Sequence, residues 1–197
     1  MWLLDVTRKT TARLTATPFH NSAPHWSPDG SRILFASSRD GQNALYVTDT
    51  GGMKQEGLLP KSDWGKGPSS WSADGRFIVY QDDHPKTLMD LWVLPLVGDR
   101  KPFPFLQTQF SEAEGALSPD GQWMAYSSDE SGQLEVYLRS FPSAENKSQV
   151  STNGGRKPQW RGDGKELFYL DGDRNLVSVD VGQSGSTADT AWWTSRR

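Results

Sequence analysis

The feature that most constrains this sequence is a unit that occurs four times along the chain. Each copy contains an Asp-Gly pair. The pairs lie 45, 46 and 43 residues apart and begin at Asp29, Asp74, Asp120 and Asp163. Asp-Gly is a strong signal for a tight hairpin turn, because Gly tolerates a positive φ and Asp bonds to nearby backbone. The segments after the pairs are rich in aromatic and β-branched residues, as strands are: RILFAS, RFIVYQ, QWMAYS and ELFYL.

Each copy has room for four strands. A short strand precedes the turn, the aromatic-rich strand follows it, and a third strand, such as ALYVTD or EVYLRSF, comes after a polar loop. A weaker fourth segment closes the unit. A period of about 40–45 residues with four strands is typical of a β-propeller blade. We therefore predict an all-β fold over residues 1–181, a small or partial β-propeller of about four blades of four antiparallel strands, at about 22–60, 67–106, 113–151 and 156–181.

The two ends of the chain depart from the repeat. Residues 2–15 are typical of the third and fourth strands of a preceding blade, whereas the last unit has no convincing fourth strand. Ala12–Thr15 is the candidate to fill that place beside Leu176–Asp180 and so close the ring. The tail at 182–197 is small and polar before its Trp-Trp and Arg-Arg pairs, and we expect it to be disordered.

The aromatic residues of the repeat are predicted to be structural. The chain has nine Trp, and large aromatic side chains suit packed sheet faces. We expect packing between blades, in place of ligand stacking, at the Trp residues that recur at blade positions: Trp26, Trp71, Trp92, Trp123 and Trp160. The Asp residues of the four Asp-Gly pairs are likewise explained by turn chemistry, without a metal ring.

Composition excludes several classes of function. The net charge is −3 with no dense basic cluster, which argues against binding of nucleic acid. No apolar stretch approaches the roughly 18 residues of a membrane span, and the first residues lack the pattern of a signal peptide. The absence of Cys excludes disulfides, thiolate catalysis and Cys-ligated zinc, but it does not fix the compartment.

A search for catalytic motifs leaves no catalytic, cofactor or metal residue to name. Kinase motifs, a phosphate-binding loop and an HExxH pair are all absent from the sequence. The nearest match to a nucleophile elbow, Gly182–Ser186, lacks the second Gly in register. Two small acidic clusters, 81–84 and 128–130, are candidate calcium sites because Ca²⁺ takes oxygen ligands, although solvated loop charge explains them as well.

The repeat resembles a known family. SPDG, an aromatic strand, a polar loop and an LYV-D-GG ending resemble the TolB-type, WD-like β-propeller repeat of bacteria, over roughly residues 2–181. The segment from Asp90 to Phe141 resembles the propellers found C-terminal to bacterial serine/threonine protein kinases. Such propellers typically have six or seven blades, so the resemblance implies the C-terminal part of a larger propeller. It also implies a periplasmic or extracytoplasmic setting.

The resemblance and the polar loops together suggest a non-catalytic recognition module for proteins or peptides. Propellers carry function on loops at the ends of a rigid scaffold. The loops between blades and those between the second and third strands share one face. The candidate binding residues on that face are Arg39, Trp64, Lys66, Asp82, Asp83, His84, Glu112, Glu114, Asp129, Glu130 and Arg156.

Two other functions stay open. One is a hydrolase, as an esterase or a peptidase-associated propeller, and the other is a truncated propeller fragment without independent activity. The state of the ends matters here, because open blade faces and unpaired edges promote association. We therefore expect either a closed monomer or a homodimer that pairs through the open blade edges.

Overall fold

The four Asp-Gly turns each join the first two strands of a four-stranded antiparallel sheet, which confirms the all-β, blade-type fold predicted from the repeat. The computed structural model describes residues 1–16, 18–52, 54–60, 62–181 and 193–196. Within those ranges there is no helix, and so no helical segment with the length and hydropathy of a membrane span.

Each sheet is built from consecutive strands and is called a blade below. Blades 1 and 2 comprise β3 (Asn21–Trp26), β4 (Arg32–Asp40), β5 (Gln42–Asp49) and β6 (Gln55–Gly57), then β7 (Lys66–Trp71), β8 (Phe77–His84), β9 (Leu88–Pro95) and β10 (Phe103–Leu106). Blades 3 and 4 comprise β11 (Glu112–Leu117), β12 (Trp123–Ser128), β13 (Glu135–Ser140) and β14 (Lys147–Gln149), then β15 (Gly155–Trp160), β16 (Glu166–Asp171), β17 (Leu176–Val181) and β18 (Trp193–Arg196). A separate hairpin comprises β1 (Trp2–Asp5) and β2 (Thr10–Arg13).

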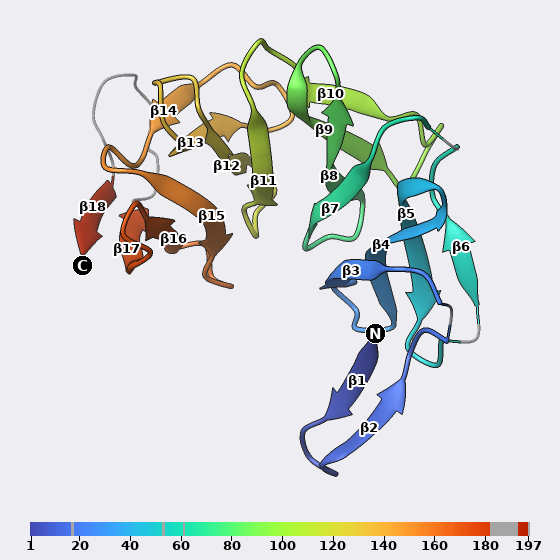
Figure 1. Cartoon of the computed structure of the whole chain (residues 1–197). Coiled ribbons are helices and arrows are strands. Elements are labelled where there is room, and N and C mark those ends of the chain that lie inside the picture. Colours follow the sequence, from blue (N-terminus) through green and yellow to red (C-terminus); the bar gives the residue numbers. More distant parts are fainter. Residues whose placement is uncertain (17, 53, 61, 182–192, 197) are drawn as a thin grey trace.

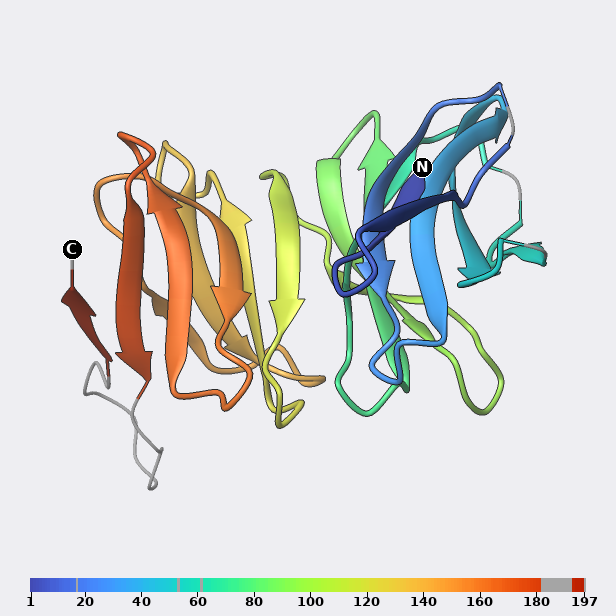
Figure 2. The ribbon, with the colours of Figure 1, turned by 90° about the horizontal axis from the view of Figure 1, so that it is seen from below.

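The blades stand side by side along an open arc (Figure 1). The first strand of each blade, β3, β7, β11 or β15, lies on the concave side, and the fourth lies on the convex side. Blades 1 and 4 are at opposite ends of the arc, and the view from below shows the same separation (Figure 2). The closed four-bladed ring, one of the two predicted arrangements, is therefore not what a single chain forms.

Apolar side chains between neighbouring blades hold the arc together. Alternate residues of a strand point to opposite faces of its sheet, so one blade supplies two cores. In β12, Met124 and Tyr126 pack on blade 2, while Ala125 packs on blade 4. Leu34 and Ile78 belong to the core between blades 1 and 2. All five of these side chains are almost fully buried, which explains why the second strands are apolar on both faces.

The Asp-Gly turns close one end of each blade, called the turn end below. In the third turn, Ser118 Oγ donates to Asp120 Oδ1 at 2.5 Å, and the backbone N–H of Gln122 donates to the same oxygen at 3.0 Å. Gly121 has a φ of 69°, a conformation that costs Gly little. Ser27 and Ser72 repeat the Ser118 pattern in the first two turns. The turn carboxylates thus find their donors within their own turns.

The first strand of every blade has a register shift that fits a β-bulge. In blade 3 the shift contains Glu114, which has a φ of 58°. Its N–H donates to Gln81 Oε1 of blade 2 at 2.8 Å, and its Oε2 accepts from the Lys157 N–H of blade 4 at 2.7 Å. The Glu114 side chain therefore links blade 3 to blade 4 by one accepted hydrogen bond, and the Glu114 backbone N–H links blade 3 to blade 2.

The structure corrects two predictions about the chain ends. Among the described strands, β2 pairs with β1 and not with β17, so Ala12–Thr15 does not close the ring. The fourth strand of blade 4 is instead β18, which pairs antiparallel with β17. The rest of the predicted disordered tail, 182–192 and 197, lies outside the described residues. The hairpin β1–β2 sits beyond blade 1 (Figure 1).

One Trp prediction is also wrong. Trp71 and Trp160 pack against the core between their own blade and the preceding one, and Trp160 Nε1 donates to the Ala116 carbonyl of blade 3. Trp26 occupies the same position in blade 1 but is 56% exposed. The difference follows from place in the arc: blade 3 covers Trp160, whereas none of the four described blades lies on the corresponding side of Trp26.

Candidate functional site

Two adjoining hollows form a groove at the end of blades 2 and 3 opposite the turn end, called the loop end below. The larger hollow has a volume of about 540 Å³, within the range of about 300–1,000 Å³ typical of ligand pockets. The smaller has a volume of about 300 Å³. Phe110 and Glu130 line the smaller hollow, and their chain neighbours Ser111 and Asp129 line the larger one. The two hollows are therefore neighbours. We call the pair the loop-end groove.

The larger hollow is lined by residues from four separate segments. Trp64 precedes β7, Ser111 precedes β11, and Asp129 follows β12. The fourth segment is the turn from β8 to β9 with the strand ends beside it, which supplies Asp83, His84, Pro85, Leu88 and Met89. Trp64 and Met89 are each 38% exposed, and Leu88 is 55% exposed. The Trp64 and His84 rings meet edge to face with centroids 5.5 Å apart. The hollow therefore presents a cluster of apolar side chains to solvent at the loop end.

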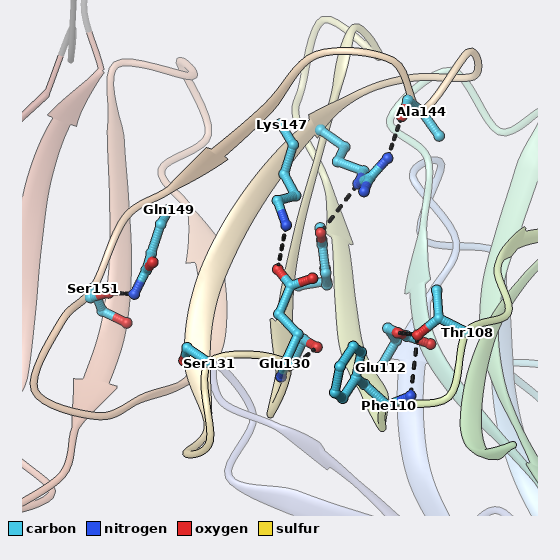
Figure 3. Close-up of polar contacts among 12 residues, drawn as sticks. Thr108, Phe110, Glu112, Glu130, Ser131, Ala144, Lys147, Gln149 and Ser151 are labelled. Atoms are coloured by element: carbon cyan, nitrogen blue, oxygen red, sulfur yellow. Dashed lines mark hydrogen bonds and ion pairs between the residues drawn. The ribbon is translucent and has the colours of Figure 1, made fainter.

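The smaller hollow is lined by Phe110, Glu130, Ser131, Tyr137, Lys147 and Gln149. Lys147 Nζ lies 2.7 Å from Glu130 Oε1 and 5.2 Å from the centre of the Tyr137 ring. Figure 3 shows Lys147 and Glu130 pointing toward each other, with Phe110 and Glu112 beside them. The charge of Lys147 is thus already shared between a carboxylate and an aromatic face.

Carboxylates surround and underlie the groove. Asp83 and Asp129 line the larger hollow. Partial burial, together with the charge of Asp82, raises the pKa of Asp83, against the opposing effect of Lys66. Glu112 is 2% exposed; burial raises its pKa, and the charge of Asp90 acts in the same direction.

Several carboxylate oxygens at this end lack donors. Among the described residues, none donates a hydrogen bond to Asp82 Oδ1, Asp90 Oδ1 or Glu112 Oε2, although all three atoms are buried. The second oxygen of each of the two Asp carboxylates does accept hydrogen bonds. Asp82 Oδ2 accepts from Lys66, and Asp90 Oδ2 accepts from Thr87 and Gln107. The loop end therefore carries more negative charge than its own donors compensate.

The structure gathers four of the predicted binding residues in the larger hollow: Trp64, Asp83, His84 and Asp129. A fifth, Glu130, lines the smaller hollow. Trp64 precedes β7, Asp83 and His84 end β8, and Asp129 and Glu130 follow β12, so the blade topology brings three separate segments together at the loop end.

Other predicted binding residues have structural partners. Lys66 Nζ lies 2.7 Å from Asp82 Oδ2 in a nearly buried ion pair, with side-chain exposures of 10% and 13%. Glu112 accepts from Thr108 Oγ1, and Glu114 links blades 3 and 4 as described above. These four side chains support the groove and do not line it.

Arg39 and Arg156 lie away from the groove. Arg39, on β4 of blade 1, stacks its guanidinium 4.1 Å from the centre of the Tyr46 ring and donates from Nε to Ser37 Oγ. Arg156 is exposed on β15, opposite Leu170 of β16. Neither residue is among the groove's lining residues.

The candidate binding residues omit most of the apolar lining: Pro85, Leu88 and Met89, with Phe110 and Tyr137 in the smaller hollow. Phe110 nevertheless lies in one of the loops predicted to share this face. Leu88 and Met89 begin β9 directly after a polar loop, and two adjacent apolar residues at that point read as ordinary strand. In the structure the buried part of β9 begins only at Asp90 and Leu91, so Leu88 and Met89 are left exposed at the start of the strand.

The residues that the structure describes contain no group of three or more His, Asp or Glu side chains that could hold a metal ion. His25 donates to the Pro68 carbonyl, and burial lowers the pKa of His25. His84 Nδ1 accepts from the Lys86 N–H at 3.3 Å. The string Gly182–Ser186 lies outside the described residues, and calcium binding at the acidic loops stays a prediction.

The chain shows distant similarity to curated proteins, while no family model matches it. It is 24% identical over 179 residues to the uncharacterized peptidase YuxL of Bacillus subtilis, covering 70% of this chain and 27% of YuxL. It is 28% identical over 134 residues to the uncharacterized protein Atu1656 of Agrobacterium fabrum, covering 64% of this chain and 46% of that protein. The chain thus spans less than half the length of these relatives.

Solved structures give a stronger likeness. TolB from Acinetobacter baumannii superposes with a TM-score of 0.76 at 18% identity, over 91% of this chain and 45% of TolB. A candidate TolB from Agrobacterium tumefaciens gives 0.63 at 16%, over 90% and 76%. A puromycin hydrolase gives 0.66 at 11%, over 88% and 29%. At these identities the likeness concerns the fold, and the chain has the fold of a TolB-like β-propeller.

Proposed function

We propose that this chain is a non-catalytic recognition module that binds a protein or peptide segment in the loop-end groove. The observation that carries the proposal is the cluster of exposed apolar side chains, Trp64, Leu88 and Met89, in a hollow of about 540 Å³. Exposed apolar clusters with a polar rim are characteristic of interaction sites, and Trp is among the residues that contribute most to binding.

Selection of random peptides displayed on phage, with the full chain as bait, tests the proposal. We expect enriched peptides whose affinity, measured by calorimetry, is weakened at least tenfold by Trp64→Ala. The matched control is Trp26→Ala, because Trp26 is also exposed but lies at the end of the arc. Enrichment of no peptide, or equal losses in the two variants, would overturn the proposal.

Hydrolysis is the second candidate function, because a puromycin hydrolase shares the fold and the curated relative YuxL carries a peptidase name. A panel of chromogenic esters and peptides, with and without a serine-directed covalent inhibitor, separates the two functions. Turnover that the inhibitor abolishes would replace the recognition module with an enzyme, and the adduct would identify the nucleophile.

Two finer features that the resemblance implies belong to the same proposal, a periplasmic or extracytoplasmic setting and association with a kinase, and the open blade ends add a third, a homodimer formed through them. The open end beyond blade 1 presents Trp2, Leu4 and Val6, each more than 60% exposed. Light scattering tests the dimer directly, and a monomer at all concentrations would remove it.

A further inference from the structure

The loop-end groove combines apolar surface with a local excess of negative charge. Trp64, Leu88 and Met89 supply the apolar surface of the larger hollow, and Asp83 and Asp129 lie in the same wall. Asp129 Oδ1 accepts one bond, from the Ser111 N–H at 2.9 Å. A ligand in the hollow would therefore meet aromatic and aliphatic carbon together with two carboxylates.

Among the residues that the structure describes, the cations near the groove do not balance this charge. The carboxylates at the loop end of blades 2 and 3 include Asp82, Asp83, Asp90, Glu112, Asp129 and Glu130. Three described lysines lie near them. Lys66 is committed to Asp82 and Lys147 to Glu130, each at 2.7 Å, while Lys86 is exposed in the β8–β9 loop and is not among the lining residues.

The buried oxygens without donors point the same way. Asp90 Oδ1 and Glu112 Oε2 receive no hydrogen bond from the described residues, so their charge is not compensated from within. Uncompensated charge at buried positions acts over longer distances than fully solvated charge, because the surrounding dielectric is lower. The field at the groove therefore favours a cationic occupant.

From this pairing of surface and charge we infer that the loop-end groove recognises a basic peptide segment, in which an aromatic or aliphatic side chain packs on Trp64, Leu88 and Met89 while a neighbouring Lys or Arg meets Asp83 and Asp129. The inference rests on the proposed function and adds the chemistry of the partner. An acidic segment would meet repulsion from both carboxylates and is excluded by the same charges.

The peptides enriched on the full chain test the inference by their composition. We expect an excess of Lys or Arg within two positions of a large apolar residue. We also expect the double variant Asp83→Asn/Asp129→Asn to weaken binding of a selected peptide about tenfold, since each partly exposed charge pair contributes modestly. Raising the salt concentration should weaken binding to the wild-type chain and have less effect on the double variant.

The controls separate the inference from the function on which it rests. Asp99→Asn/Asp173→Asn removes two loop carboxylates that do not line the groove and should leave the affinity unchanged. Enriched peptides that depend on Trp64 but carry no excess of basic residues, or that bind the Asp83→Asn/Asp129→Asn chain unchanged, would overturn the inference and keep the recognition module. Failure to enrich any peptide would overturn both.

Discussion

Carboxyl groups at the two ends of the blades have pKa values shifted in opposite directions. At the turn end, Asp29 accepts from Ser27 Oγ and from the Ser31 backbone and side chain, and these bonds lower its pKa to about 2. At the loop end of blades 2 and 3, burial raises the pKa of Asp83 and Glu112. The turn-end carboxylates are bonded within their own turns and stabilise the fold, whereas Asp83 at the loop end lines the groove, where a ligand can reach it.

Sequence repetition follows this division. The turn end repeats because every blade needs the same turn, with a side chain before the Asp that bonds to it. The fourth turn keeps the arrangement with a different residue, since Arg161 replaces Ser and donates to Asp163 through Nε and Nη2, each at 2.7 Å. The loop end varies from blade to blade, and the loop-end groove lies on blades 2 and 3.

The largest effect should come from the loop-end ion pair that supports the groove. Replacing Lys66 with Met leaves Asp82 nearly buried without its partner, which costs about 3–5 kcal/mol. Urea denaturation of Lys66→Met should show that loss in the free energy of unfolding. The double variant Lys66→Met/Asp82→Leu should recover most of it, because an apolar pair needs no compensating charge.

That result would show that the Lys66–Asp82 pair contributes to stability, in contrast to Asp83 and Asp129, which line the groove and are assigned to binding. Full stability in Lys66→Met would mean that Asp82 is compensated by solvent. The distinction between supporting and lining residues would then fail.

A pair of matched Ser→Ala variants compares the two ends directly. Ser118 is buried at the turn end, donates to Asp120 and accepts from the Trp123 N–H at 2.9 Å. Ser118→Ala should lower the free energy of unfolding by about 1–2 kcal/mol, the cost of leaving such groups unpaired. Ser131, exposed in the smaller hollow, donates only to the Gln133 carbonyl, and Ser131→Ala should stay within about 0.5 kcal/mol.

Thermal and urea denaturation of both variants measure these effects. An equal loss in Ser131→Ala would show that the loop end is as tightly built as the turn end. That outcome would remove the structural basis for separating the two ends.

The acid dependence of stability gives a smaller effect of known sign. The pKa of Glu112 is raised by burial, so its ionisation opposes folding. This opposition is absent below the ordinary carboxyl pKa of 4.5 and complete once the pH exceeds the raised pKa. Gln at this position keeps the oxygen that accepts from Thr108 and carries no charge.

The difference in unfolding free energy between Glu112→Gln and the wild-type chain should therefore rise as the pH increases above 4.5. Denaturation between pH 3 and pH 7 measures it. A difference that falls with pH would mean that Glu112 is stabilised as the anion and has donors at both oxygens.

Much of the fold is predictable from sequence because its repeated parts are local. Each Asp-Gly turn needs a few consecutive residues, and the alternation of Met124, Ala125 and Tyr126 already shows a strand buried on both faces. The exposure of Trp26 was not predictable, because the same residue type is covered in blades 2 and 4 by a neighbour that blade 1 lacks. The place of β18 was missed because its segment shows no strand alternation.

The groove was predictable only in part. Its charged residues lie in recognisable polar loops, so Asp83, His84 and Asp129 could be named from sequence. Whether a charge lines the surface or supports it depends on partners far along the chain, such as Asp82 for Lys66 and Lys157 for Glu114. The hollow itself depends on four segments meeting, which no single stretch of sequence encodes.

The smallest expected effect is the difference in pKa between a turn-end carboxyl, Asp29, and a loop-end carboxyl, Asp83. Residue-specific NMR titration of the carboxyl carbons should place the midpoint of Asp29 near pH 2, below the ordinary value of 3.8, and that of Asp83 above 3.8. Because the charge of Asp82 contributes to the shift of Asp83, Asp82→Asn should lower the Asp83 midpoint and leave Asp29 unchanged. Midpoints for Asp29 and Asp83 in the reverse order would mean that the loop end supplies its carboxylates with donors as completely as the turn end does, and the negative field attributed to the groove would disappear with that order.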